Sequence, residues 1–135
     1  TVFGVKGGGY DNNQSATMVA YCFAPIAGYS AFGSYTGNGS NDGPFVFTNF
    51  KPAYVMLKST GVEQWLIFDT ARGTYNNNNP YLVASSSGAE GAFTAPQMLS
   101  NGFRLNTNDL GLNQNTVTYI YMAFASVPFK YSLAR

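Results

Sequence analysis

The sequence predicts an all-β protein: an antiparallel β-sandwich, jelly-roll-like, with about eight to ten short strands and little or no helix. Aromatic residues, which favour strands, make up 16% of the chain and are mostly Tyr (10) and Phe (11). The 15 Gly, together with many Asn, Ser and Thr, supply turns. These turns separate apolar or alternating segments at intervals of about 8–12 residues, which is the spacing typical of a sandwich.

The expected elements follow one another along the whole chain. We expect strands at 3–6, 16–26, 29–36, 44–50, 53–58, 64–69, 81–84 and 116–127. We expect turns or loops at 7–13, 37–43, 59–63, 76–79 and 85–91, because Gly, Asn and Ser gather there. Within 98–105, the dipeptide Asn101-Gly102 predicts a hairpin with a two-residue turn.

Two of the expected strands, 16–26 and 117–127, are almost continuously apolar. Such runs are typical of strands that are buried on both faces or that line a sheet–sheet core. Pro25 either ends the first run or places that end at a sheet edge, since proline has no N–H for a ladder. We therefore expect both runs to be central strands.

The end of the chain also resembles its beginning. Residues 15–30 read S-A-T-M-V-A-Y-C-F-A-P-I-A-G-Y-S, and residues 116–131 read T-V-T-Y-I-Y-M-A-F-A-S-V-P-F-K-Y, at a constant offset of 101 residues. Upstream, Phe3-x-Val5 faces Phe103-x-Leu105 with a one-residue slip. This repetition predicts a chain cut from a tandem array. We expect the two copies to be equivalent closing strand pairs of one sandwich, with Phe23 and Phe124 both in its core.

Length and charge narrow the classes of function. A chain of 135 residues with 45% hydrophobic residues is one β domain, residues 1–135, with a real core. The net charge is +1 and the Lys and Arg are scattered, so we expect no nucleic-acid partner. No apolar run reaches transmembrane length, so we expect no membrane insertion. The chain starts at Thr1 without a basic leader, and we expect a piece of a longer or processed protein.

The chain has few residues of the types that carry out catalysis, so we expect a protein without enzyme activity and without a cofactor. There is no His and one Cys, which removes imidazole bases and His- or Cys-based metal sites. We expect Cys22 to be a small core residue. The carboxylates are Asp11, Asp42, Glu63, Asp69, Glu90 and Asp109, and no pair of them is marked by its sequence setting. For Asp69 we expect a turn contact with Arg72.

Two segments offer binding hypotheses. The turn at 37–43 (G-N-G-S-N-D-G) could hold calcium, but its single carboxylate favours a plain Gly/Asn turn with positive φ. Aromatic faces beside amides suit a sugar, and this predicts a glycan site of Tyr75, Asn76, Asn77, Asn78 and Tyr81. Trp65 lies nearby in sequence, but its apolar run favours a place in the core.

Several motifs carry a resemblance to a known family. They are S-Y-T-G-N-G-S-N-D-G-P-F-V-F-T-N-F-K-P-A-Y-V-M-L-K (34–58), F-D-T-A-R-G-T-Y-N (68–76), L-S-N-G-F-R-L (99–105) and T-Y-I-Y-M-A-F-A-S-V-P-F-K (118–130). With them the chain resembles a module of uncharacterised virion proteins of marine and cyanobacterial tailed phages. Tyr54 stands where that family usually has Trp, and Phe47 where it has Tyr. By this resemblance, residues 1–28 look like the end of a preceding unit and 34–129 like a complete one.

The resemblance implies a structural protein at the surface of a virion, in a tail fibre or as a capsid decoration. Its partners would be other virion proteins and further copies of itself. The alternative is a carbohydrate-binding module that recognises a host surface glycan. A hydrolase would require two carboxylates facing each other across a cleft.

Overall fold

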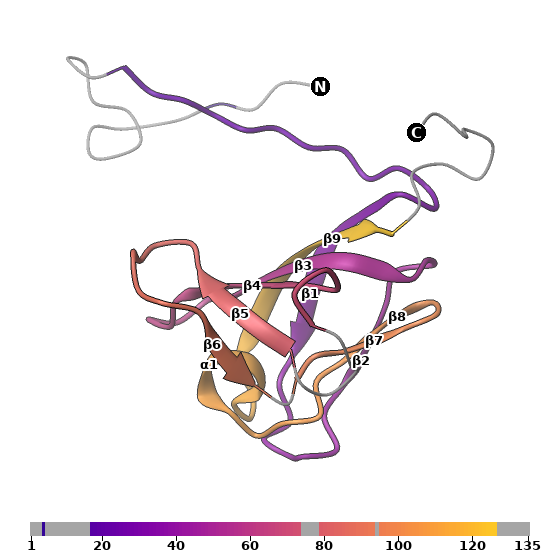
Figure 1. The fold of residues 1–135 in the computed structure, drawn as a ribbon, viewed down its shortest axis with the longest axis vertical. Coiled ribbons are helices and arrows are strands. Elements are labelled where there is room, and N and C mark those ends of the chain that lie inside the picture. The colour runs from indigo at the N-terminus through magenta and orange to yellow at the C-terminus, as the bar shows by residue number, and fades with distance from the viewer. Residues whose placement is uncertain (1–3, 5–16, 74–78, 94, 127–135) are drawn as a thin grey trace.

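The described part of the chain contains nine short strands and one short helix (Figure 1). The computed structural model describes residue 4 and residues 17–73, 79–93 and 95–126. The elements are β1 (Ser30–Thr36), β2 (Phe45–Phe47), β3 (Pro52–Ser59), β4 (Trp65–Asp69), β5 (Asn79–Val83), β6 (Gly91–Phe93), β7 (Gln97–Leu99), β8 (Gly102–Arg104), α1 (Leu110–Asn113) and β9 (Thr118–Ala125). This confirms the predicted all-β fold class. The strand expected at 3–6 lies almost wholly outside the described residues.

Two antiparallel sheets form the sandwich. The larger has the order β1-β9-β3-β4-β5-β6, and the smaller has the order β2-β8-β7. Alternate residues of each strand point into the space between the sheets, so that space holds the core. Its fully buried side chains include Val55, Leu57, Phe68, Phe103 and Tyr119. β9 lies between β1 and β3, which confirms that the closing strand is central.

The expected strands at 29–36, 44–50, 53–58, 64–69, 81–84 and 116–127 all correspond to strands of the structure. The β7–β8 hairpin is confirmed with a turn one residue earlier than predicted. Leu99 pairs with Gly102, so Ser100 and Asn101 form the loop. Gly102 belongs to β8, where a Cβ would come within 2.1 Å of the carbonyl oxygen of Val46. A glycine at position 102 therefore allows β8 to pack closely against β2. Strand β6 and helix α1 were not predicted.

The segment 37–43 is a turn, as predicted, and a buried side chain holds it. Gly39 has φ +66°, the left-handed conformation that favours glycine. The fully buried amide of Asn113 donates to Asn38 Oδ1 (2.9 Å) and to the carbonyls of Ser40 (2.8 Å) and Thr107 (2.7 Å). Its own Oδ1 accepts from the N–H of Asn38 at 2.8 Å. The turn is thus fixed to the end of α1.

Two tyrosine hydroxyls fasten α1 to the core. Tyr119 donates to the carbonyl of Leu110 (2.5 Å) and accepts from the N–H of Gln114 (2.8 Å). Tyr35 donates to the carbonyl of Leu112 at 2.7 Å. The two tyrosine rings are stacked, with centroids 5.0 Å apart. These bonds satisfy helix-end carbonyls that a four-residue helix cannot satisfy internally.

The structure contradicts the expected partnership of the two repeat copies. Residues 17–25, called the arm below, are extended but pair with no strand, and they run away from the sheets (Figure 1). Phe23 is 57% exposed and Cys22 is exposed, so neither is a core residue as predicted. The physical reason is that β9 already occupies the position between β1 and β3. The arm, which has a similar sequence, therefore cannot occupy that position in the same sheet.

The face of the six-stranded sheet that points away from the smaller sheet, called the outward face below, is also apolar. One residue from each of five adjacent strands forms a row across it: Phe32, Met122, Met56, Ile67 and Leu82. All five side chains are half-buried or exposed. Trp65 lies half-buried next to Lys58 on this face, so the prediction that it belongs to the core is wrong.

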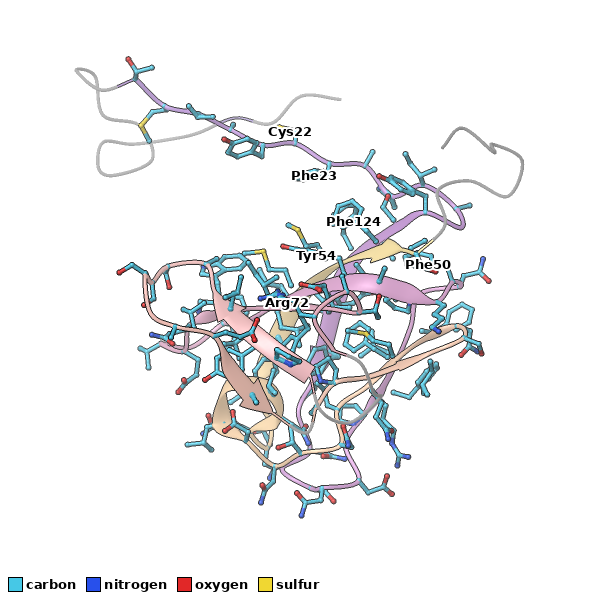
Figure 2. All side chains as sticks on the ribbon, viewed as in Figure 1. Cys22, Phe23, Phe50, Tyr54, Arg72 and Phe124 are labelled. Atoms are coloured by element: carbon cyan, nitrogen blue, oxygen red, sulfur yellow. The ribbon has the colours of Figure 1, made fainter. Side chains whose placement is uncertain are left out.

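An aromatic cluster around Phe124 continues the outward face toward the arm, so Phe124 is half-buried on this face and is not a core residue as predicted. The ring centroids of Phe23, Tyr29, Phe32 and Tyr54 each lie 5.9 Å from that of Phe124. Figure 2 shows Phe23, on the arm, facing Phe124 across the end of the sheet. The arm therefore contacts the outward face through the ring of Phe23, whereas its apolar side chains at Met18, Val19 and Tyr21 are exposed.

Candidate functional site

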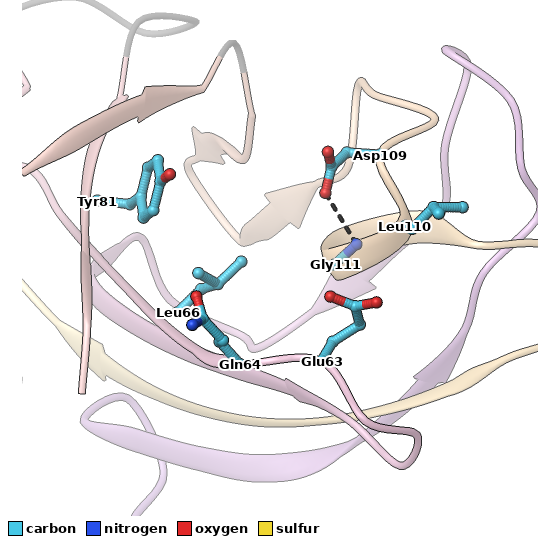
Figure 3. A pocket seen from close by; sticks show the side chains of 7 residues that line it. All are labelled: Glu63, Gln64, Leu66, Tyr81, Asp109, Leu110 and Gly111. Atoms are coloured by element: carbon cyan, nitrogen blue, oxygen red, sulfur yellow. Dashed lines mark hydrogen bonds between the residues drawn. The ribbon is translucent and has the colours of Figure 1, made fainter. Parts of the chain in front are cut away.

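A pocket of about 280 Å³ lies between the β3–β4 loop, β5 and α1 (Figure 3). Its lining residues are Glu63, Gln64, Leu66, Tyr81, Asp109, Leu110 and Gly111. Leucine side chains and the tyrosine ring supply apolar surface, and the two carboxylates and the amide supply polar groups. An apolar wall with a few convergent polar groups is typical of a small-molecule site.

Asp109 is placed by its role as the N-cap of α1. Its Oδ1 accepts from the N–H of Gly111 at 2.8 Å, and its own N–H donates to Thr107 Oγ1 at 3.1 Å. This cap explains why a helix starts at Leu110, because the side chain satisfies one of the free N–H groups of the first turn. It also fixes one carboxylate at the rim of the pocket.

Glu63 brings a second carboxylate to the same pocket from the loop between β3 and β4. Burial raises the pKa of the Tyr119 hydroxyl, and the negative charges of Glu63 and Asp109 raise it further, against a hydrogen bond from Gln114. Both carboxylates therefore act on the tyrosine that anchors α1. The pocket is acidic and offers acceptors to hydroxyl or amine donors of a ligand.

Tyr81 contributes an aromatic wall from β5. It lies opposite Gly91 of β6, where a Cβ would come within 2.4 Å of the tyrosine ring. Its ring centroid is 6.1 Å from that of Phe68 in the core. Only a glycine in β6 leaves room for the ring, so the short strand pair β5–β6 positions this side of the pocket.

Of the predicted glycan residues, the structure places Tyr81 in a pocket. Tyr75, Asn76, Asn77 and Asn78 lie outside the described residues. The other polar lining residues were missed, because Glu63, Gln64 and Asp109 come from loops far apart in the sequence. A signal existed only for Asp109, since an Asp before Leu-Gly-Leu can cap a short helix.

The predicted Asp69–Arg72 contact is confirmed and extends to a third group. Asp69 Oδ1 accepts from the N–H groups of Ala71 (3.1 Å) and Arg72 (2.9 Å), and Arg72 Nε donates to Oδ2 at 2.6 Å. Arg72 Nη1 also lies 3.4 Å from Glu90. Burial alone would raise the pKa of Asp69, but the hydrogen bonds and charge of Arg72 outweigh it and hold that pKa below its ordinary value. This cluster is a structural turn contact.

The described residues contain no group of three or more His, Cys, Asp or Glu side chains arranged to hold a metal ion. In the 37–43 turn, the carboxylate of Asp42 pairs with Arg104. A search of the same described residues for a helix that is long and apolar enough to cross a membrane finds none.

Comparison with known proteins adds one match. No curated protein and no solved structure matches this chain. Residues 1–128 match the family described as "Domain of unknown function (DUF7483)". The match includes the arm as well as the sandwich. Because it covers nearly the whole chain, the protein belongs to the DUF7483 family.

Proposed function

We propose that the protein is a structural module of a bacteriophage particle, in a tail fibre or on the capsid surface, and that it acts by assembly and not by catalysis. The observation that carries the assembly role is the apolar surface formed by the arm and the outward face. On the arm, Val19 is 74% and Tyr21 is 83% exposed, and the row from Phe32 to Leu82 consists of half-buried and exposed side chains. Connected apolar surface of this kind marks a contact with another protein.

The assignment to a phage particle rests on the resemblance of residues 34–58, 68–76, 99–105 and 118–130 to phage virion modules. The low charge fits the same role, since 10% charged residues and a net charge of +1 give little electrostatic repulsion between neighbouring copies. Assembly on a particle would cover the apolar surface that a free monomer exposes.

Immunogold electron microscopy of purified particles tests the location. Antibody against the purified chain should label one part of the particle, tail or capsid, and mass spectrometry of the same particles should detect its peptides. Particles that carry no such peptides, together with a purified chain that does not sediment with capsids or tails, would contradict the proposal.

The pocket favours a second candidate function, the recognition of a glycan. Tyr81 offers a ring face for stacking on a sugar, and Glu63, Gln64 and Asp109 offer partners for its hydroxyls. This candidate is compatible with a tail fibre, because a fibre contacts the host surface.

A glycan array with the purified chain tests this candidate. The replacement Gln64→Ala should weaken binding of any hit about tenfold, which corresponds to one or two hydrogen bonds. Gln114→Ala is the matched control, because that side chain is exposed and lies outside the pocket lining. An array without a hit, or equal losses for the two variants, would exclude the pocket as a glycan site.

A further inference from the structure

Strand β1 has an unused edge. It pairs with β9 on one side, and it is the outermost strand of the six-stranded sheet as described. Among the described residues, the only backbone pairing on its other side is a single bridge, in which the N–H groups and carbonyls of Ile26 and Ser30 bond to each other at 3.1 and 2.9 Å. Beyond that bridge, β1 offers a template on which a further strand can pair.

The arm has the sequence of a strand that pairs with β1. At the offset of 101 residues, its positions 17, 19, 21 and 23 correspond to Thr118, Ile120, Met122 and Phe124, the outward residues of β9. The arm has Thr, Val, Tyr and Phe there. The outward half of β9 is thus repeated in the arm.

The inward residues of the arm differ from those of β9, and the difference suits the free edge of β1. Tyr119 and Tyr121 of β9 fill the core, whereas the arm has Met18 and Ala20 at those places. Met18 cannot make the two hydrogen bonds of the Tyr119 hydroxyl, so the arm is a poor replacement for β9 itself. Met18 and Ala20 are smaller than the two tyrosines of β9, which suits the free side of β1, where the ring of Tyr121 already covers Gly33.

The same chain does not fill its own edge. A hairpin that continued the Ile26–Ser30 bridge would place Phe23 opposite Gly33, on the inward face of the sheet. A shift of one residue in the pairing moves every side chain of a strand to the opposite face of the sheet. The arm therefore cannot continue the hairpin and keep Phe23 on the outward face. In the structure, Phe23 lies on the outward face, stacked on Phe32 at 5.8 Å. The arm therefore does not pair with β1 of its own chain as a continued hairpin.

We propose that the arm of one copy pairs antiparallel with the β1 edge of a second copy, in the register that β9 uses on the other side of β1. This deepens the assembly role proposed above and does not depend on the assignment to a phage particle. In this register, Tyr21 lies beside Phe32 and lengthens the apolar row of the outward face. Cys22 lies opposite Ala31. When both copies exchange arms, the contact is symmetric and closes as a dimer.

Disulfide trapping tests the pairing, because directly opposite residues of antiparallel strands have Cα atoms about 4.5–5.5 Å apart, within disulfide range. Under oxidising conditions, the full chain with Ala31→Cys should form a covalent dimer through Cys22 of the other copy, identified by peptide mass spectrometry. Phe32→Cys is the control, since the next side chain points to the opposite face. Wild-type protein gives the background from Cys22 alone. We expect at least a tenfold excess of dimer for Ala31→Cys.

Sedimentation velocity gives an independent readout without cross-linking. Wild-type protein should dimerise at micromolar concentration, and Tyr21→Asp in the exposed arm should make it monomeric while leaving the circular dichroism of the body unchanged. Val62→Asp is the matched control, because Val62 is fully exposed in the β3–β4 loop. A wild-type monomer, a bond within one chain, or equal trapping at positions 31 and 32 would overturn the proposal. In each of these cases, immunogold labelling would still test whether the protein is part of a particle, so the two proposals can fail separately.

Discussion

Removing one hydroxyl group from the core tests whether the tyrosine anchors hold α1 and the pocket. The change is Tyr119→Phe. The Tyr119 side chain is fully buried, and its hydroxyl makes two hydrogen bonds, to the carbonyl of Leu110 and from the N–H of Gln114. A net hydrogen bond contributes about 1 kcal/mol, so we expect the free energy of unfolding to fall by about 2 kcal/mol. In a domain of this size, that lowers Tm by about 7 °C.

Tyr121→Phe is the matched control, because it makes the same change two residues along the same strand and on the same face. Within the described part of the chain, the Tyr121 hydroxyl contacts Gly33 and makes no hydrogen bond. Urea unfolding followed by the fluorescence of Trp65, the single tryptophan, measures both variants. If Tyr119→Phe falls within about 0.5 kcal/mol of Tyr121→Phe, the anchoring argument is wrong.

Three further predictions concern backbone packing and titration. Gly43→Ala should destabilise the fold by more than about 3 kcal/mol in thermal unfolding, because a Cβ would lie 1.6 Å from a backbone oxygen, whereas Gly88→Ala in an open loop should change little. Asp69→Asn should cost about 1 kcal/mol at pH 7, and acid titration should show this cost vanishing as pH falls through the lowered pKa of Asp69, since the charged form is the one that Arg72 stabilises. Burial raises the pKa of Tyr35, so its contribution to stability should be complete below pH 10 and be lost as pH rises above it, with phenolate absorbance appearing only as the chain unfolds.

Sequence patterns predicted the strands well where burial alternates or is continuous. The apolar runs at 53–58 and 64–69, joined by the turn at 59–63, form the paired strands β3 and β4, and alternate side chains of each strand are buried in the core. Gly39 was predictable as a turn residue, since its positive φ is a local property. Short elements such as β6 and α1 were not predictable, because three or four residues carry too little periodicity.

The candidate pocket was harder to predict because no local pattern brings Glu63 and Asp109 together. Their meeting depends on how the β3–β4 hairpin and α1 pack against the same core, which is a tertiary property. The prediction for the arm was wrong for a different reason. Its apolar pattern predicted a central strand, but residues 17–25 are not a strand in the structure, because such a pattern does not specify which strand lies beside it.

The neighbouring ends of β1 and β9 also have a mechanical consequence. Ser30, where β1 begins, lies opposite Phe124, near the end of β9. The chain therefore enters and leaves the sandwich at one corner. Tension applied through both ends would separate the two strands by unzipping, one hydrogen-bonded pair at a time, and would not load the whole ladder in shear. A module pulled in this way lies beside the line of force and resists tension only weakly.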